Sequence, residues 1–167
     1  VLAFGIHQVS GSIPGVTYMS TSTLAFRSAA QLIRGYKAHR FTPLDVLAAV
    51  FARVDECEPQ VNAWQLVDRR RARRAAQAST RRWADGHPRG LLDGVPVAIK
   101  DVTETRGWPT LNGSLAIDPK GPWPVDAIVV ERLKAHGAVI LGKTETPEFA
   151  WRGITCLLYT SPSPRDL

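Results

Sequence analysis

A short apolar segment that ends on a lysine constrains the fold of this chain more than any other feature of its sequence. Residues 94–101 read Gly-Val-Pro-Val-Ala-Ile-Lys-Asp, and the run Val97–Ile99 predicts a buried strand because it is continuous and largely β-branched. Gly94 and Pro96 mark the start of that strand. Lys100 then falls at its carboxyl end, where open α/β sheets hold their ligands and catalytic groups.

Two interpretations of Lys100 follow from this placement. A lysine at such a position is poorly hydrated, so its neutral form is favoured and it can act as a base. The alternative is a solvated lysine at a strand end that pairs with the adjacent Asp101, as is common for charged residues. The choice between them depends on the rest of the chain.

Helical sequence precedes this strand. Apolar spacing predicts a helix over 24–36, and Thr42 and Pro43, followed by Asp45, form a strong start signal for a second helix. The buried face of the second helix is predicted at Leu47, Val50, Phe51 and Val54. An arginine-rich helix follows, and we expect its packed side to consist of Ala72, Ala75, Ala76, Ser79 and Trp83.

A loop, a helix and a second strand are predicted after Lys100. Residues 107–124 are rich in Gly and Pro, Asp126 is a candidate helix cap, Gly137 ends the helix, and residues 138–141 form the next buried strand. The inward side of that helix is predicted at Ile128, Val129, Leu133 and Ala135. Strand, helix and strand in this order imply a parallel crossover, and we expect an α/β fold with a helical lead-in.

The net charge of +6 raises the alternative of a basic nucleic-acid-binding module. Much of that charge comes from the arginines of residues 69–82, which spread over a broad helical face without interleaved aromatic residues. Such a face is usually a solvated one, so we expect no specific nucleic-acid partner. Any real contact would be directed at phosphates and weakened by salt.

Residues 137–144 match the phosphate-loop pattern G-x-x-x-x-G-K-[ST]. Its four middle residues are Ala, Val, Ile and Leu, which form the predicted strand itself rather than a loop around a phosphate. Pro147 also interrupts the stretch where the following helix should continue. We therefore expect no nucleotide site, and we interpret Ser114 as a turn serine or a pocket wall rather than a nucleophile, because it lacks a strand–turn–helix setting.

Linked blocks of sequence carry a family resemblance. Leu92-Asp93-Gly94 is followed in order by Gly107-Trp108-Pro109-Thr110, Asn112-Gly113-Ser114, Asp126-Ala127, the segment 137–144 and Pro147-Glu148-Phe149. Their order and spacing over Leu92 to about Thr155 resemble the amidase signature family. The resemblance implies the N-terminal part of that family's α/β fold, a helical lead-in followed by a mixed sheet flanked by helices. It also implies that Lys100 is the base of a Ser–cis-Ser–Lys triad that hydrolyses carboxamides, and that the enzyme needs no metal or organic cofactor.

The serines of that triad, with a glycine-rich segment supplying oxyanion-binding amides, are expected well after Phe149 and do not occur in this sequence. The resemblance therefore implies an inactive N-terminal fragment of an amidase acting on a small-molecule amide. A second possibility within the family is an amidotransferase A-type subunit that supplies ammonia for tRNA-bound Asp or Glu. The stretches 107–111 and 151–153 resemble the free-standing amidases more.

The two ends of the chain are expected to lie outside the amidase domain. Residues 1–18 are interpreted as a non-native or disordered extension, with Met19 as the candidate start, and residues 19–155 as one partial domain. Residues 156–167 are interpreted as an artefactual tail, because 156–166 resemble a translated transposase-type sequencing adapter. Within the domain, Cys57 alone cannot form an intrachain disulfide, so we expect a cytoplasmic protein. The histidines are dispersed, so we expect no metal site. No apolar stretch approaches the length of a membrane span, so we expect no membrane contact.

Overall fold

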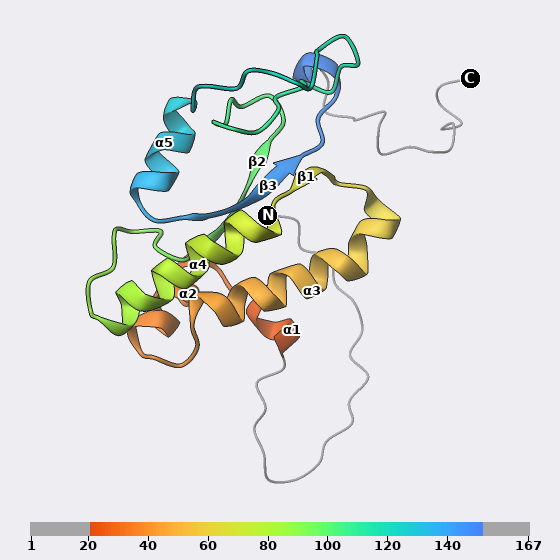
Figure 1. The fold of residues 1–167 in the computed structure, drawn as a ribbon. Coiled ribbons are helices and arrows are strands. Elements are labelled where there is room, and N and C mark those ends of the chain that lie inside the picture. The colour runs from red at the N-terminus through yellow and green to blue at the C-terminus, as the bar shows by residue number, and fades with distance from the viewer. Residues whose placement is uncertain (1–20, 152–167) are drawn as a thin grey trace.

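The computed structural model describes residues 21–151, in which helices pack on both faces of a small mixed sheet (Figure 1). In chain order the elements are α1 (Thr21–Leu24), α2 (Ala29–Lys37), α3 (Pro43–Val61), β1 (Trp64–Val67), α4 (Arg69–Ala84), β2 (Pro96–Lys100), α5 (Ile128–Ala135), β3 (Val139–Thr144) and the 3₁₀ turn η1 (Glu148–Ala150). α3 and α4 cover one face, and α5 lies on the other (Figure 1). The predicted α/β class with a helical lead-in is confirmed.

The sheet has the order β1-β3-β2. β2 and β3 are parallel, which confirms the predicted crossover through α5, and β1 runs antiparallel to β3. β1 was not predicted from the sequence, because its four residues are half-buried and lack a clear alternation. Its pairing leaves no room beside β3: a Cβ at Gly142 would lie 1.9 Å from the Leu66 carbonyl oxygen.

The register between β2 and β3 shifts by one residue. Val97 lies opposite Ile140, but Ala98 lies opposite Gly142, so Leu141 is the extra residue of β3. Before the shift the sides alternate: Val139 and Leu141 pack against α3 and α4, while Ile140 packs with α5. After it, Lys143 lies opposite Ile99, on the same face as Ile140. The shift therefore turns Lys143 away from α3 and α4.

The predicted start signal of the second helix is confirmed. Thr42 caps α3, and its side chain and that of Asp45 form a reciprocal capping box. The predicted helix over 24–36 is instead two helices, because Ser28 caps α2 in a second capping box with Gln31. Leu24 and Leu32, on either side of the break, still share one buried cluster.

The arginine-rich helix packs as predicted. Asp68 caps α4 by accepting a hydrogen bond from the Arg71 amide, at 2.8 Å. Ala72, Ala76 and Ser79 are fully buried, and Ala72 and Ala76 contact the side of β3 that carries Leu141.

The predictions for α5 are partly wrong. Its N-cap is Ala127, and the side chain of Asp126 instead accepts a hydrogen bond from the Arg106 amide and pairs with Lys134. Ile128 and Val129 are 73% and 53% exposed, whereas Val130 is fully buried. Consecutive residues of a helix are about 100° apart, so Val129 and Ile128 lie about 100° and about 200° away from the inward-facing Val130.

β2 is less buried than predicted, because it is an edge strand of the described sheet: only Ile99 is buried, and Ala98 is exposed. Gly137 ends α5 with a left-handed φ of 81°, as expected. None of the helices between residues 21 and 151 combines the length and the apolarity that crossing a bilayer requires.

Candidate active site

Lys100 lies at the carboxyl end of β2, opposite Thr144 of the parallel strand β3. Its side chain is exposed, so the expectation of a poorly hydrated lysine is wrong for the described residues. The physical reason is the pleat of an edge strand: Ile99 and Asp101 point into the structure and are buried, while Ala98 and Lys100 point to the uncovered face. The role of Lys100 as a base stays a prediction.

The alternative in which Lys100 pairs with Asp101 is not what the structure shows. Asp101 is fully buried, and one of its carboxylate oxygens lies 3.0 Å from the ammonium of Lys143, which is also fully buried. The other oxygen accepts a hydrogen bond from the Leu111 amide at 3.1 Å. The carboxylate next to Lys100 is therefore committed to the opposite face of β2.

Lys143 is thus the buried lysine of this region, although the sequence singled it out only as part of the phosphate-loop pattern. Its ammonium donates hydrogen bonds to the Pro109 carbonyl, at 3.0 Å, and to the Thr110 hydroxyl. Burial lowers the pKa of Lys143, and the adjacent charge of Asp101 opposes that shift. The signal that could have found it is its position inside an apolar strand, but its partner depends on the register shift.

A cavity of about 560 Å³ lies next to this end of the sheet. Its lining comes from the segment that follows β2, from the loop before α5 and from the N-cap residue of that helix: Val102, Thr103, Glu104, Thr110, Asn112, Ile117, Trp123 and Ala127. The wall therefore offers hydroxyl, amide and carboxylate groups, and Lys100 itself is not among its lining residues. Apolar side chains with a few polar groups are typical of small-molecule pockets.

Ser114 is buried beside this loop. Its hydroxyl donates a hydrogen bond of 2.6 Å to the carboxylate of Glu148 and accepts one from the Ala116 amide, at 3.3 Å. These contacts tie the loop before α5 to η1. They fit the interpretation of Ser114 as a turn serine, and it stays outside the proposed catalytic group.

The segment that matches the phosphate-loop pattern is a strand. Residues 139–144 form β3, and the residues from Val139 to Lys143 are buried by neighbours on both faces. The lysine and threonine of the pattern therefore do not follow a phosphate-binding turn. The interpretation of this pattern as a strand is confirmed.

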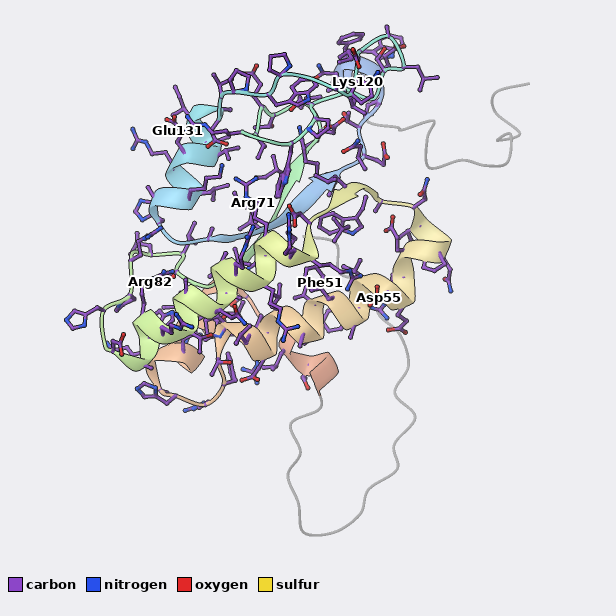
Figure 2. All side chains as sticks on the ribbon, viewed as in Figure 1. Phe51, Asp55, Arg71, Arg82, Lys120 and Glu131 are labelled. Atoms are coloured by element: carbon purple, nitrogen blue, oxygen red, sulfur yellow. The ribbon has the colours of Figure 1, made fainter. Side chains whose placement is uncertain are left out.

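Some arginines of α4 make ion pairs, hydrogen bonds and aromatic contacts with other parts of the molecule. Arg69 pairs with Asp55 and lies 4.6 Å from the ring centre of Phe51, which places two labelled side chains of α3 beside α4 (Figure 2). Arg71 donates to the Arg106 carbonyl at 3.1 Å and lies 4.9 Å from the ring centre of Trp108, between α4 and the loop after β2 (Figure 2).

Arg82, also labelled in Figure 2, pairs with the buried carboxylate of Asp93. These contacts make α4 a packed structural helix with some exposed arginines, in line with the expected solvated face. Among residues 21–151, no group of three or more His, Cys, Asp or Glu side chains is placed to hold a metal ion.

Comparison with known proteins now adds to this geometry. Residues 45–159 match the family model described as Amidase, which is more than half of the chain. The chain belongs to the amidase family. The signature blocks around Lys100 lie inside the matched region, as the resemblance predicted.

Among curated proteins, this amidase-family chain is 44% identical over 116 residues to the A subunit of glutamyl-tRNA(Gln) amidotransferase from Anaeromyxobacter sp. (strain K), covering 70% of the chain and 23% of that protein. It is 39% identical over 146 residues to the protein of the same name from Carboxydothermus hydrogenoformans, covering 86% and 30%. The chain thus spans about a quarter of the length of the curated relatives it matches.

Among solved structures, a bacterial aryl acylamidase of the amidase signature family matches with a TM-score of 0.73 and 26% identity, over 78% of this chain and 27% of that one. The peptide amidase of Stenotrophomonas maltophilia matches with a TM-score of 0.69 and 30% identity, over 77% and 26%. The mixed sheet with its flanking helices is therefore the arrangement found in part of these enzymes.

Proposed function

We propose that this chain is the N-terminal part of an enzyme that cleaves the C–N bond of a small carboxamide, with Lys100 as the base. One observation carries the proposal: in an amidase-family segment, Lys100 ends a strand with its side chain exposed, while its neighbouring carboxylate is engaged on the other face. The amine of Lys100 is thus not tied up in an ion pair with Asp101. The two serines of the triad are expected in sequence beyond Phe149.

The chemistry of such a site starts with a proton transfer. A serine hydroxyl is a weak nucleophile until a base removes its proton, and Lys100 would take that proton through the bridging serine. The serine oxygen then bonds to the carbonyl carbon, and the C–N bond breaks as the departing nitrogen receives the proton. Water cleaves the resulting acyl ester to a carboxylate and restores the serine.

Substitution of Lys100 in the longer enzyme tests this proposal. Lys100→Ala removes the base and is expected to lower turnover by at least about 1,000-fold, because the members of a triad act as a unit. Lys100→Arg is expected to be nearly as damaging, since arginine stays protonated at neutral pH. Lys37→Ala, an exposed lysine at the end of α2, is the matched control. Near-normal amide hydrolysis by Lys100→Arg would rule out the proposed base.

A second candidate function has support of its own. The curated relatives at 39–44% identity are A subunits of glutamyl-tRNA(Gln) amidotransferases, which favours a role in supplying ammonia over the free-standing amidase expected from residues 107–111. The two candidates share the amide cleavage and differ in its regulation. Ammonia release from glutamine that rises when glutamyl-tRNA is added supports the amidotransferase role. Release from simple carboxamides without any tRNA supports the free-standing enzyme.

A further inference from the structure

The buried pair of Lys143 and Asp101 has no part in the proposed triad, yet Asp101 directly follows the proposed base in the chain. Lys100 and Asp101 are consecutive, so whatever holds Asp101 also sets the position of the Lys100 backbone. Lys143 reaches Asp101 only because the register shift in β3 places it opposite Ile99. The pair is therefore built by an irregularity of the sheet rather than by its regular alternation.

Asp101 is held from several directions. Its amide donates to the Thr144 carbonyl at 3.0 Å, and its carbonyl accepts from the Asn112 amide at 3.0 Å. Its carboxylate accepts from the Leu111 amide and pairs with Lys143. These contacts join the end of β2, the end of β3 and the loop that supplies Asn112 to the cavity wall.

Resting on the proposed function, we propose that Lys143 is a positioning residue for Lys100: it holds the Asp101 carboxylate on the far face of β2 and compensates its charge. Two fully buried ions compensate each other at 3.0 Å, whereas either one alone would act on its surroundings through a medium of low dielectric constant. The lysine amine on the near face then stays free to accept a proton from serine.

Other ionisable groups surround the pair. Glu104, on the segment after β2, acts on Lys143, and Glu145, directly after β3, faces Asp101. Glu58 of α3 acts on Glu145 and accepts hydrogen bonds from the amides of Ala63 and Trp64. All three are carboxylates, so Lys143 is the cation that balances Asp101 among the charged groups that these contacts identify.

The test is the pH profile of kcat/KM for amide hydrolysis by the longer enzyme. Lys143→Met leaves Asp101 uncompensated, which favours protonated Lys100 and should move the acidic limb of the profile about one pH unit higher. Asp101→Asn leaves Lys143 uncompensated and should move the limb lower, while asparagine can still accept from the Leu111 amide. The double variant Lys143→Met/Asp101→Asn removes both charges and should return the limb to its original position.

A purely structural pair would lower kcat without these opposite displacements. Far-UV circular dichroism and thermal melting establish which variants are folded, and Lys37→Met is the matched control for loss of a lysine. An unchanged limb in a folded single variant overturns the proposal, as does failure of both single variants to fold. The Lys100→Ala variant tests the proposed base separately. If that variant keeps its activity, the proposed function is contradicted, independently of the pH profiles of the Lys143 and Asp101 variants.

Discussion

The exposed apolar side chains of residues 21–151 lead to a prediction about this segment on its own. Eight large apolar side chains are between 46% and 80% exposed: Phe26, Val61, Leu91, Val125, Ile128, Val129, Phe149 and Trp151. Together they leave the equivalent of about five side chains unburied, which at about 1.5–3 kcal/mol each amounts to about 8–15 kcal/mol. The net stability of a whole domain is only about 5–15 kcal/mol.

We therefore expect residues 19–155, expressed alone, to aggregate or to behave as a molten globule. The helices should give a far-UV circular dichroism signal, but thermal melting should be gradual and the sample should bind a hydrophobic dye. Scanning calorimetry with light scattering is the deciding assay, because a cooperative domain of this size absorbs about 90 kcal/mol at about 0.7 kcal/mol per residue. A sharp two-state transition of that size in a monomeric sample would contradict this prediction, because it would show that the segment is an autonomous domain.

Three further predictions concern labelling and stability. A serine-directed acylating probe should leave the 167-residue chain unlabelled, as seen by intact-mass spectrometry, because the triad serines are expected in later sequence. In the longer enzyme, Arg82→Met should lower the free energy of unfolding by about 2–4 kcal/mol in urea melts at pH 7. The substitution leaves the fully buried carboxylate of Asp93 without its ion-pair partner. Burial opposes ionisation of Asp93, but the hydrogen bond from Arg82 prevails and lowers its pKa. The folded state therefore holds that proton less tightly than the unfolded state, so the stabilisation is present above the ordinary carboxyl pKa of 3.8 and lost as pH falls through the lowered value. An Arg82→Met penalty that stays the same at pH 2 would contradict this assignment. Gly142→Ala should destabilise by at least about 2 kcal/mol, because the new Cβ would meet the Leu66 carbonyl oxygen and separate β1 from β3; a melt like that of the parent would contradict the β1 pairing.

How far the sequence predicts this fold depends on whether the signal is local. The capping residues Thr42 and Asp45 act on their own helix, and the start of α3 follows from them directly. The α4 face is equally local, since small residues at helical spacing leave one stripe to pack. β1 has no such local signal, because its four half-buried residues form a strand only by pairing with β3, far along the chain. The exposed Val129 has none either, because which of three adjacent apolar residues faces inward is set by the sheet beneath α5.

The same distinction separates Lys100 from Lys143 at the candidate site. The position of Lys100 at a strand end follows from the residues around it, whereas the partner of Lys143 follows from a one-residue shift between two strands. Regular alternation would place Lys143 on the side of Leu141, facing α3 and α4. The shift places it beside Asp101 instead, and in doing so decides which lysine the carboxylate pairs with.

The side chains of β2 and of the residue after it divide between an exposed and a buried side. Ala98 and Lys100 are exposed on one side of the strand, while Ile99 and Asp101 are buried on the other, so the described residues complete only the support for Lys100. The contacts that hold this end of β2 include the ion pair of Asp101 with Lys143, which lies on the buried side of the strand. Under the proposed function, a serine on the open side would meet a lysine whose backbone is held and whose neighbouring carboxylate in the chain is paired with Lys143. If Lys100 is the base, as proposed, residues 21–151 anchor its backbone, and the nucleophile, the bridging serine and the dry surroundings would come from other sequence.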